Sequence, residues 1–396
     1  MRFLLFILLF ILSSSILSAA PRRDLAPKVE EIQSKAVEYL LKNQMPNGSW
    51  MMHPAITGLA CLGIADTPSA SLPETKAKLD KALDFIVGCA SENGVIDAAM
   101  GRRSYPVYST SISLVCLAKF NRPKDMDVMK KARAYLVSPD VYPEGNPEHD
   151  PDAAGTGYGR HHRSDLSNTA WAMEALHVTE HLDKEPYNND PNRASSAKLA
   201  WDKALTFITH CQNLKDTNQS AWVKSAPDDD KGGFIYSPAD AMRSADVTRR
   251  ATDTAAPPLK GRPQPSQAQM LRSYGSMTYS GLKCLIYAKV HKDDIRMKSA
   301  FDWVKRYYTV DENPGVGTAG YYYYLHTFSK TLALFNQPVI TDAKGIDHDW
   351  QAEMVAAIAK HQQPDGSWVN DNGRWMESLP ALSTSYVLMA LGNISR

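Results

Sequence analysis

A motif that occurs near both ends of the chain restricts the fold more than any other feature of this sequence. Residues 44–50 read QMPNGSW and residues 362–368 read QQPDGSW, and weaker copies of the same unit lie between them. Each unit begins with an amphipathic helix, because Ala, an aromatic residue three positions later and an aliphatic residue four positions later share one helical face. In the first unit this stripe is Ala36, Tyr39, Leu40 and Gln44. A glycine that accepts a positive φ follows the helix in most units: Gly48, Gly94, Gly233, Gly315 and Gly366.

The second helix of each unit is more apolar and richer in small residues, which is typical of a buried helix. The predicted inner helices span residues 57–64, 111–120, 168–176, 279–290, 326–335 and 383–391. Six such pairs predict an all-α fold, the (α/α)6 toroid, in which an outer ring of helices surrounds an inner one. An open superhelix is the alternative, but no polar unit is present that would cap its ends.

A closed ring predicts one domain, because cutting it would expose its buried faces. We expect this domain to cover residues 21–396, with long loop insertions at 139–165 and 213–273. The net charge of +1 provides no global field for recruiting nucleic acid. The five cysteines all lie in predicted helices and include no C-x-x-C pair, so we expect small buried residues and no disulfide framework.

The amino-terminal segment has the pattern of a secretory signal peptide. Arg2 precedes an apolar run over residues 3–12, and small residues occupy positions 18 and 20. We therefore expect residues 1–20 to be removed during export to the periplasm or the extracellular space. An uncleaved membrane anchor is the alternative, and we expect no membrane span in the mature chain.

Gln-x-x-x-Gly-Ser-Trp units that alternate with apolar inner helices resemble the prenyltransferase and squalene oxidase repeat. The resemblance covers most of residues 29–394 and is strongest in the first and last units. It implies the superfamily of terpenoid cyclases, such as squalene–hopene cyclase, and of protein prenyltransferase β subunits. Both use an (α/α)6 barrel with an aromatic-lined cavity. Fold similarity does not carry function, so each chemistry has to be sought at its own residues.

The acid motif of the cyclases is altered in this chain. In that family Asp-x-Asp-Asp-Thr-Ala opens an inner helix, and its central Asp protonates an alkene or epoxide. Residues 165–170 read DLSNTA, so Ser167 replaces the proton donor and Asn168 its neighbour. Because an alcohol does not protonate an alkene, we expect no cyclisation of this type. The acidic run at residues 228–230 precedes a pair of glycines, and we interpret it as a solvated turn.

The zinc site of the protein prenyltransferases is altered as well. That site takes Asp-x-Cys from the start of one inner helix and a His from the next. Residues 276–278 read SMT, which leaves His326 as one ligand out of three. We therefore expect no metal and no other cofactor, and we interpret His326 as a hydrogen-bonded residue of the cavity wall.

Residues that do not repeat, near the starts of the inner helices, are the better candidates for function. If the chain is an enzyme, the catalytic candidates are Asp165, His161 and His162; the ligand-binding candidates are Arg163, Tyr158, Tyr279, His326, Arg374 and Trp375. The same regions also hold Tyr105, Tyr108, Tyr274, Tyr321–Tyr324, Asp371 and Glu377. Arg, His and Tyr suit an anion, and aromatic faces suit prenyl chains or sugar rings. For Asp165 a helix amino-terminal cap is the alternative role.

These patterns leave three hypotheses for the function. The first is an exported protein similar to terpenoid cyclases or prenyltransferases that binds or acts on an isoprenoid or other lipid. The second is a carbohydrate-active toroid, a lyase or hydrolase of an acidic glycan, which needs a carboxylate pair or a base in the mouth. The third is a noncatalytic binding toroid. A deep aromatic cavity favours lipid, an open groove with paired carboxylates favours glycan, and a filled hole favours neither.

Overall fold

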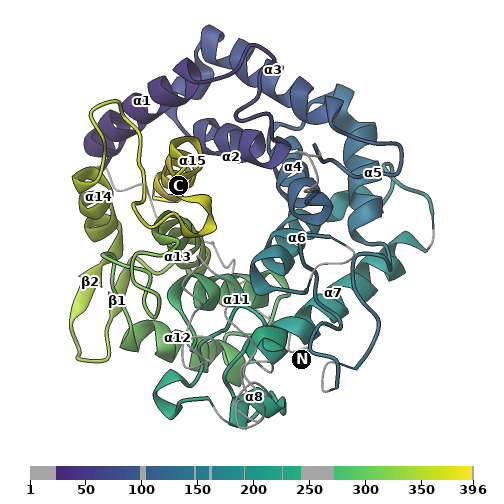
Figure 1. Cartoon of the computed structure of the whole chain (residues 1–396), viewed down its shortest axis with the longest axis vertical. Coiled ribbons are helices and arrows are strands. Elements are labelled where there is room, and N and C mark those ends of the chain that lie inside the picture. The colour runs from purple at the N-terminus through teal and green to yellow at the C-terminus, as the bar shows by residue number, and fades with distance from the viewer. Residues whose placement is uncertain are drawn as a thin grey trace, which may run out of the picture.

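Helices alternate along the chain between an outer and an inner ring (Figure 1). The computed structural model describes residues 24–98, 104–146, 149–159, 163–190, 192–224, 226–241 and 272–394. The outer helices are α1 (Ala26–Lys42), α3 (Pro73–Gly88), α5 (Met126–Leu136), α7 (Arg193–Cys211), α12 (Ile295–Arg306) and α14 (Trp350–Lys360). The inner helices are α2 (Pro54–Ala65), α4 (Pro106–Phe120), α6 (Leu166–Val178), α11 (Gly275–Tyr287), α13 (Tyr321–Phe335) and α15 (Pro380–Gly392).

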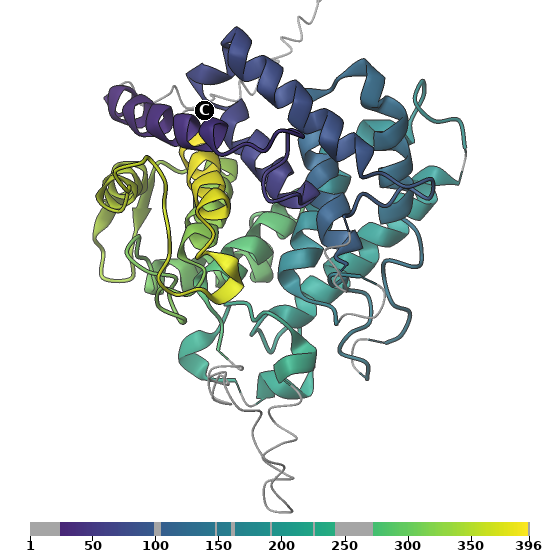
Figure 2. The same cartoon turned by 45° about the horizontal axis from the view of Figure 1, so that its top comes forward.

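The ring closes on itself. Each inner helix packs against the inner helices on both sides, and α15 packs against α2. In the outer layer α1 meets α14, so the first and last units join in both layers. Figure 2 shows the same two layers after a 45° turn. The protein is therefore all-α with the (α/α)6 toroid architecture predicted from the sequence, and the open superhelix is wrong.

Burial separates the two layers as the sequence pattern predicts. In α2 every residue from Pro54 to Ile64 is buried, because the helix is enclosed by its neighbours and by α3. In α1 only one stripe is buried, formed by Val29, Ile32, Gln33, Ala36, Val37 and Leu40. An amphipathic helix thus covers an apolar one in each unit, and burial of this apolar surface supplies the main driving force for the fold.

Every inner helix begins two to five residues before its predicted start. Pro54, Pro106 and Pro380 open α2, α4 and α15, where the fixed φ and the missing N–H of proline suit a first turn. The prediction took the small apolar run as the start and missed these turns. As a consequence, Tyr279 and His326 lie more than a full turn inside their helices, roughly 6 and 7.5 Å along the helix axis from the first residue.

The repeated glutamines connect neighbouring units by hydrogen bonds to the backbone. Gln44 Nε2 donates to the carbonyl oxygen of Lys78 in the next outer helix at 2.9 Å, and Gln212 donates in the same way to Arg296 at 2.9 Å. Gln362 donates to Ile32 of α1 at 3.1 Å, which joins the last unit to the first. Gln44 and Gln362 therefore have a structural role. The repeated indoles are also structural: Trp50 and Trp368 are buried, and each donates to a carbonyl of its own outer helix at 2.9 Å.

Glycines in the turns touch the backbone of the next outer helix. Gly366 has a φ of +90°, and a Cβ atom there would lie 2.3 Å from the carbonyl oxygen of Lys35. Gly48 and Gly94 make the same approach to the following outer helices. In the fourth unit it is Gly232, not the predicted Gly233, that has the positive φ. These turns require glycine both for the left-handed backbone and for the close contact.

Several smaller elements complete the described chain. An antiparallel hairpin of β1 (Val339–Thr341) and β2 (Asp347–Asp349), absent from the sequence prediction, connects α13 to α14. A short helix, α8 (Ala221–Lys224), lies in the second insertion. Single 3-10 turns span Pro68–Ser71, Pro123–Asp125, Glu180–Asp183, Asp228–Asp230 and Arg374–Met376.

The acidic run at Asp228–Asp230 is only in part the solvated turn that the sequence indicates, because Asp228 and Asp229 are exposed and Asp230 is not. Asp230 is buried, and its carboxylate accepts hydrogen bonds from the indole of Trp303 at 3.1 Å and from the amide of Ser273 at 2.5 Å. It therefore ties the insertion to the outer helix α12.

The remaining expectations concern the cysteines, the amino-terminal segment and membrane spans. The five cysteines are free, and four of them are buried, as predicted. The predicted signal peptide at residues 1–20, and residues 242–271 of the second insertion, lie outside the described residues. In the part of the chain that is described, no helix is long and apolar enough to cross a membrane.

Candidate functional site

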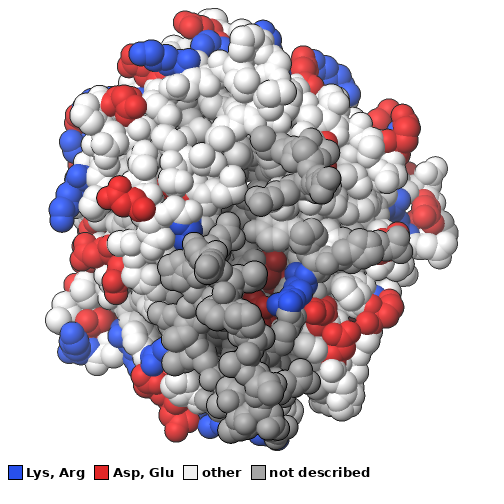
Figure 3. All heavy atoms as spheres, in the orientation of Figure 1, with Lys and Arg blue, Asp and Glu red and all other residues white. Residues whose placement is uncertain are grey.

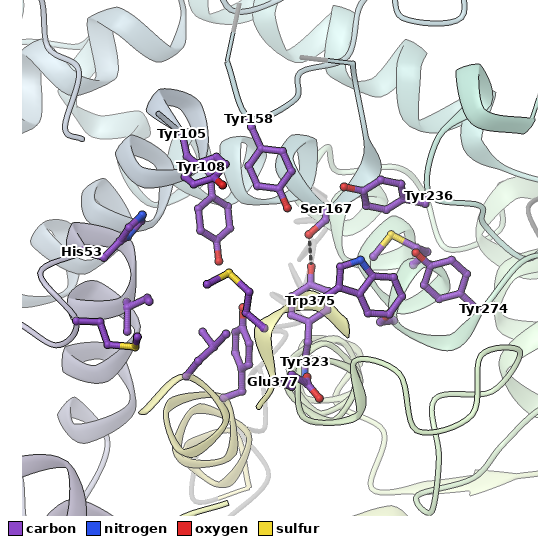
Figure 4. Close-up of a pocket in the computed structure, with 17 residues that line it drawn as sticks. His53, Tyr105, Tyr108, Tyr158, Ser167, Tyr236, Tyr274, Tyr323, Trp375 and Glu377 are labelled. Atoms are coloured by element: carbon purple, nitrogen blue, oxygen red, sulfur yellow. Dashed lines mark hydrogen bonds between the residues drawn. The ribbon is translucent and has the colours of Figure 1, made fainter. Parts of the chain in front are cut away.

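A chamber of about 550 Å³ lies where the inner helices begin (Figure 4). The described residues of its wall are Met51, His53, Ile56, Tyr105, Tyr108, Tyr158, Ser167, Tyr236, Tyr274, Ser276, Met277, Tyr323, Trp375, Met376, Glu377, Leu382 and Tyr386. The volume falls within the range of small-molecule sites, roughly 300–1,000 Å³. Charged side chains of both signs are scattered around the outer part of the face shown in Figure 3.

Aromatic rings form most of the chamber wall and brace one another. Tyr158 makes edge contacts with Tyr105 and Tyr108, at centroid distances of 5.2 and 5.7 Å. On the opposite side Tyr274 stacks on Trp375 at 6.0 Å. Such contacts fix the rings and present apolar faces to the interior.

Burial keeps the hydroxyl groups of Tyr108 and Tyr386 neutral. It raises the pKa of Tyr108 to about 12 and raises the pKa of Tyr386 well above its ordinary value, and these two hydroxyls share a hydrogen bond. Tyr323 bonds to Ser167 at 3.1 Å and to Ser280 at 3.5 Å. Ser167, in the first turn of α6, thus shares a hydrogen bond with a tyrosine hydroxyl of the opposite helix α13.

Glu377 brings a carboxyl group to the chamber wall, but its oxygens cap a helix. They accept the amides of Tyr322 at 3.2 Å and Tyr323 at 2.8 Å at the start of α13, and the side-chain amide of Asn370 at 2.7 Å. Burial raises the pKa of Glu377, and these hydrogen bonds oppose the rise. The carboxyl group is therefore positioned for structure and is not directed at a ligand.

Asp165 caps α6 from within the protein interior. Its carboxyl accepts the amide of Asn168 at 2.8 Å and the Asn168 side chain at 2.7 Å. Burial raises its pKa to about 7, although bonds from Asn168 and from the Tyr236 hydroxyl oppose this rise. Asp165 thus has the cap role given as the alternative, together with a protonation change near neutral pH.

A second, smaller pocket of about 350 Å³ adjoins the chamber. Its described wall consists of Tyr158, Arg163, Ser164, Asp165, Tyr236, Ser237 and Asp240. Tyr158 and Tyr236 belong to both cavities. Arg163 is half-exposed and pairs with Asp240 at 2.8 Å, so its charge is already compensated.

The structure brings together some of the predicted site residues and separates others. Tyr158 and Trp375 line the chamber, Asp165 and Arg163 line the adjoining pocket, and the guanidinium of Arg374 lies 4.5 Å from the ring centre of Trp375. His161 and His162 lie outside the described residues.

Tyr279 and His326 are buried and do not belong to the chamber wall described above. Tyr279 packs against Tyr324 and Phe328 in the helical core. His326 stacks between the rings of Trp171 and Tyr386. Neither of its ring nitrogens has a hydrogen-bond partner, so its predicted role as a hydrogen-bonded wall residue is wrong. Burial lowers the pKa of His326 to about 3, which keeps the ring neutral.

A buried ionic cluster beneath the chamber was not predicted. Glu174 of α6 pairs with Lys283 of α11 at 2.6 Å and with Lys330 of α13 at 3.3 Å. The two cations hold the pKa of Glu174 far below its ordinary value. Because the carboxylate of Glu174 connects the inner helices α6, α11 and α13, the cluster is a cross-link within the inner ring.

Sequence reasoning missed seven of the described wall residues: Met51, His53, Ile56, Tyr236, Met376, Leu382 and Tyr386. His53 directly precedes Pro54, the first residue of α2. Because proline is common at the first position of a helix, Pro54 was a sequence signal that could have located His53 at the start of this helix. Tyr236 lies in the second insertion and Tyr386 lies in the second turn of α15, where no repeat signal marks them. Among the residues that the structure describes, no group of three or more His, Cys, Asp or Glu side chains could hold a metal ion.

Comparison with known proteins adds little to these observations. No protein-family model and no curated protein matches the chain. A solved complex of a variant of type II terpene cyclase MstE from Scytonema with merosterolic acid A (product) has a TM-score of 0.41 and 14% identity, covering 86% of this chain and 98% of that one. Apo MstE from Scytonema has a TM-score of 0.37 and 13% identity, covering 92% of this chain and 98% of that one. A protein from Actinoplanes has a TM-score of 0.36 and 14% identity, covering 93% of this chain and 100% of that one. At these values the function has to be argued from the chamber itself.

Proposed function

We propose that this protein binds an isoprenoid or a similar apolar lipid in its central chamber, without the acid or zinc chemistry associated with its repeat. The observation that carries the proposal is the aromatic and apolar wall around about 550 Å³ of space. Transfer of a hydrocarbon chain from water to such a wall is favourable by roughly 25 cal/mol per Å² buried.

The polar groups of the chamber support binding more than catalysis. Protonation of an alkene needs a strong carboxylic acid aimed at the ligand. Here Ser167 stands at that place, and Glu377 has its oxygens on the start of α13. A glycan lyase or hydrolase needs two carboxyl groups or a base facing the substrate. The described wall of the chamber contributes one carboxyl group, that of Glu377.

A chamber-filling variant tests the proposal. Ser167 is partly exposed toward the chamber, so Ser167→Phe places a ring in the cavity. We expect the wild type to bind farnesol and geranylgeraniol, followed by intrinsic tryptophan fluorescence and native mass spectrometry, and S167F to bind them at least tenfold more weakly. Acidic oligosaccharides should not bind to either protein.

Ser195→Phe, on the exposed side of the outer helix α7, is the matched control and should bind like the wild type. Melting temperatures of both variants verify that they fold. If an acidic oligosaccharide binds and the isoprenoid alcohols do not, or if S167F and S195F bind farnesol equally, the proposed function is wrong.

A further inference from the structure

The amino ends of the inner helices point toward the chamber, and four of them are capped by a side-chain acceptor. Asp97 accepts the amide of Tyr105 at the start of α4 at 2.9 Å, and Asn313 accepts the amide of Ser276 at the start of α11 at 2.9 Å. Asp165 and Glu377 do the same for α6 and α13. These acceptors satisfy amides that a helix cannot bond internally.

The starts of α2 and α15 differ from these four, because no described side chain accepts an amide from the first turn of either helix. At α2 the N-cap residue is His53, a polar side chain, whereas at α15 it is Leu379. Helix α2 is 12 residues long, and Ile56 of its first turn lines the chamber. A helix start of this kind has a positive partial charge of roughly half a unit.

The imidazole of His53 provides an independent indication of a ligand group at the same place. It lines the chamber, is 6% exposed, and its Nδ1 atom has no hydrogen-bond partner. Figure 4 shows the ring at the edge of the chamber beside Tyr105, and the two ring centres lie 6.3 Å apart. A buried polar nitrogen without a partner costs roughly 1–3 kcal/mol. Nδ1 is covered by the surrounding protein, so a turn of the ring is needed to present it to a ligand acceptor, and the bond formed there recovers this cost.

We propose that the chamber binds an apolar chain that ends in a single carboxylate, and that the carboxylate binds at His53 and the start of α2. The inference rests on the proposed function and specifies the class of ligand. The hydrocarbon chain occupies the aromatic part of the chamber, and the carboxylate accepts a hydrogen bond from the imidazole and interacts favourably with the helix start.

The wall favours one negative charge over several. Its described residues include no Lys or Arg; Arg374 stacks on the ring of Trp375, and Arg163 of the adjoining pocket pairs with Asp240. A diphosphate needs several cations or a metal ion to replace its hydration. One imidazole and one helix start match a monoanion better.

Binding of a carboxylate at His53 predicts a coupled proton. In the free protein burial lowers the pKa of His53, while the charge of Asp97 partly opposes this shift. Asp97 is itself bonded to Ser104, Tyr105 and Ser109. The other titratable groups of the described chamber wall are Glu377 and the tyrosines Tyr105, Tyr108, Tyr158, Tyr236, Tyr274, Tyr323 and Tyr386. A bound carboxylate favours the imidazolium, so the complex takes up a proton and affinity for the carboxylate rises as the pH falls from 8 to 6.

Three probes with one hydrocarbon skeleton test the inference: farnesoic acid, farnesol and farnesyl diphosphate. Isothermal titration calorimetry at pH 6, 7 and 8, in buffers of different ionisation enthalpy, gives affinity and proton uptake together. For the wild type we expect farnesoic acid to bind roughly tenfold or more tightly than farnesol, with proton uptake. Farnesyl diphosphate should bind more weakly than farnesoic acid, and farnesol should show no pH dependence.

Variants of His53 separate the hydrogen bond from the charge. His53→Gln keeps a donor but does not titrate, so it should retain part of the affinity for farnesoic acid and lose proton uptake. His53→Phe should bind farnesoic acid and farnesol equally. The control is His361→Gln, at the exposed end of an outer helix, which should behave as the wild type.

Equal affinity of the wild type for farnesoic acid and farnesol overturns the inference, and so does tighter binding of the diphosphate. Unchanged proton uptake in H53Q also overturns it. All three of these results leave the proposed function intact. Failure of every probe to bind the folded wild type instead rejects the proposed function itself.

Discussion

Gly366→Ala tests whether the ring is held closed at its seam. Gly366 belongs to the last unit, and its Cα faces the backbone of α1 in the first unit. An added Cβ would lie 2.3 Å from the carbonyl oxygen of Lys35 and 2.7 Å from its carbonyl carbon. Backbone atoms on both sides must therefore separate, because no flexible side chain is available to move.

The magnitude follows from two contributions that the structure allows to be separated. A left-handed φ of +90° costs an alanine roughly 1–2 kcal/mol. Separation of the seam weakens the bond from Gln362 to Ile32, which contributes roughly another 1 kcal/mol, in addition to lost packing between α1 and the last unit. We expect G366A to lower the free energy of unfolding by at least about 2–3 kcal/mol, which is the sum of these two contributions before any lost packing is added.

Gly345→Ala is the matched control for backbone strain. Gly345 lies in the exposed turn of the hairpin with a φ of +82°, and a Cβ there would meet nothing within 4 Å. Its cost should therefore be the strain alone, roughly 1–2 kcal/mol. Urea unfolding of the three proteins, followed by far-UV circular dichroism and tryptophan fluorescence, measures the difference. Equal destabilisation by G366A and G345A would refute the reasoning, because the contact at the seam would then contribute nothing.

Two further predictions concern the buried ionisable groups. Glu174→Gln leaves Lys283 and Lys330 without their shared anion, so it should lower the free energy of unfolding by roughly 3–5 kcal/mol. Lys283→Met leaves Glu174 paired with Lys330 and should lower it by less. Urea unfolding midpoints at pH 7 rank the two variants, and equal midpoints or the reverse order would contradict the role of Glu174 as a cross-link. Asp165 has a pKa of about 7 in the folded protein against an ordinary 3.8, so the folded state binds more protons between these values and stability falls as the pH rises through this window. Asp165→Asn keeps a capping acceptor and should flatten the profile between pH 5 and 8, and a variant with the same slope as the wild type contradicts this assignment.

The repeat predicted the architecture because each copy carries the same physical requirement. Gln44 and Gln362 recur since each must reach the backbone of the next outer helix, and the turn glycine recurs since that backbone leaves no space for a Cβ. Such constraints are local in sequence and are visible without a structure. The hairpin at β1 and β2 breaks the repeat, and no periodic signal marks it.

The site was less predictable because it depends on where each inner helix starts. A shift of four or five residues moved Tyr279 and His326 from the expected mouth into the core. A shift of three residues brought Pro54 to the start of α2 and His53 to the chamber wall. Tyr236 reaches the wall from an insertion, and sequence alone does not specify the path of such a loop.

The capping pattern explains why carboxyl groups near the mouth are a poor guide to chemistry in this ring. A toroid of this kind directs all its inner helix starts toward one cavity, and each start leaves amides that need an acceptor. Asp97, Asp165 and Glu377 meet that need for three helices, so their position follows from the fold before any ligand is considered. The informative position is then a helix start that lacks such an acceptor. Because α2 is in this state beside an unpartnered His53, an acidic group on the ligand would complete at α2 the pattern that α4, α6, α11 and α13 already show.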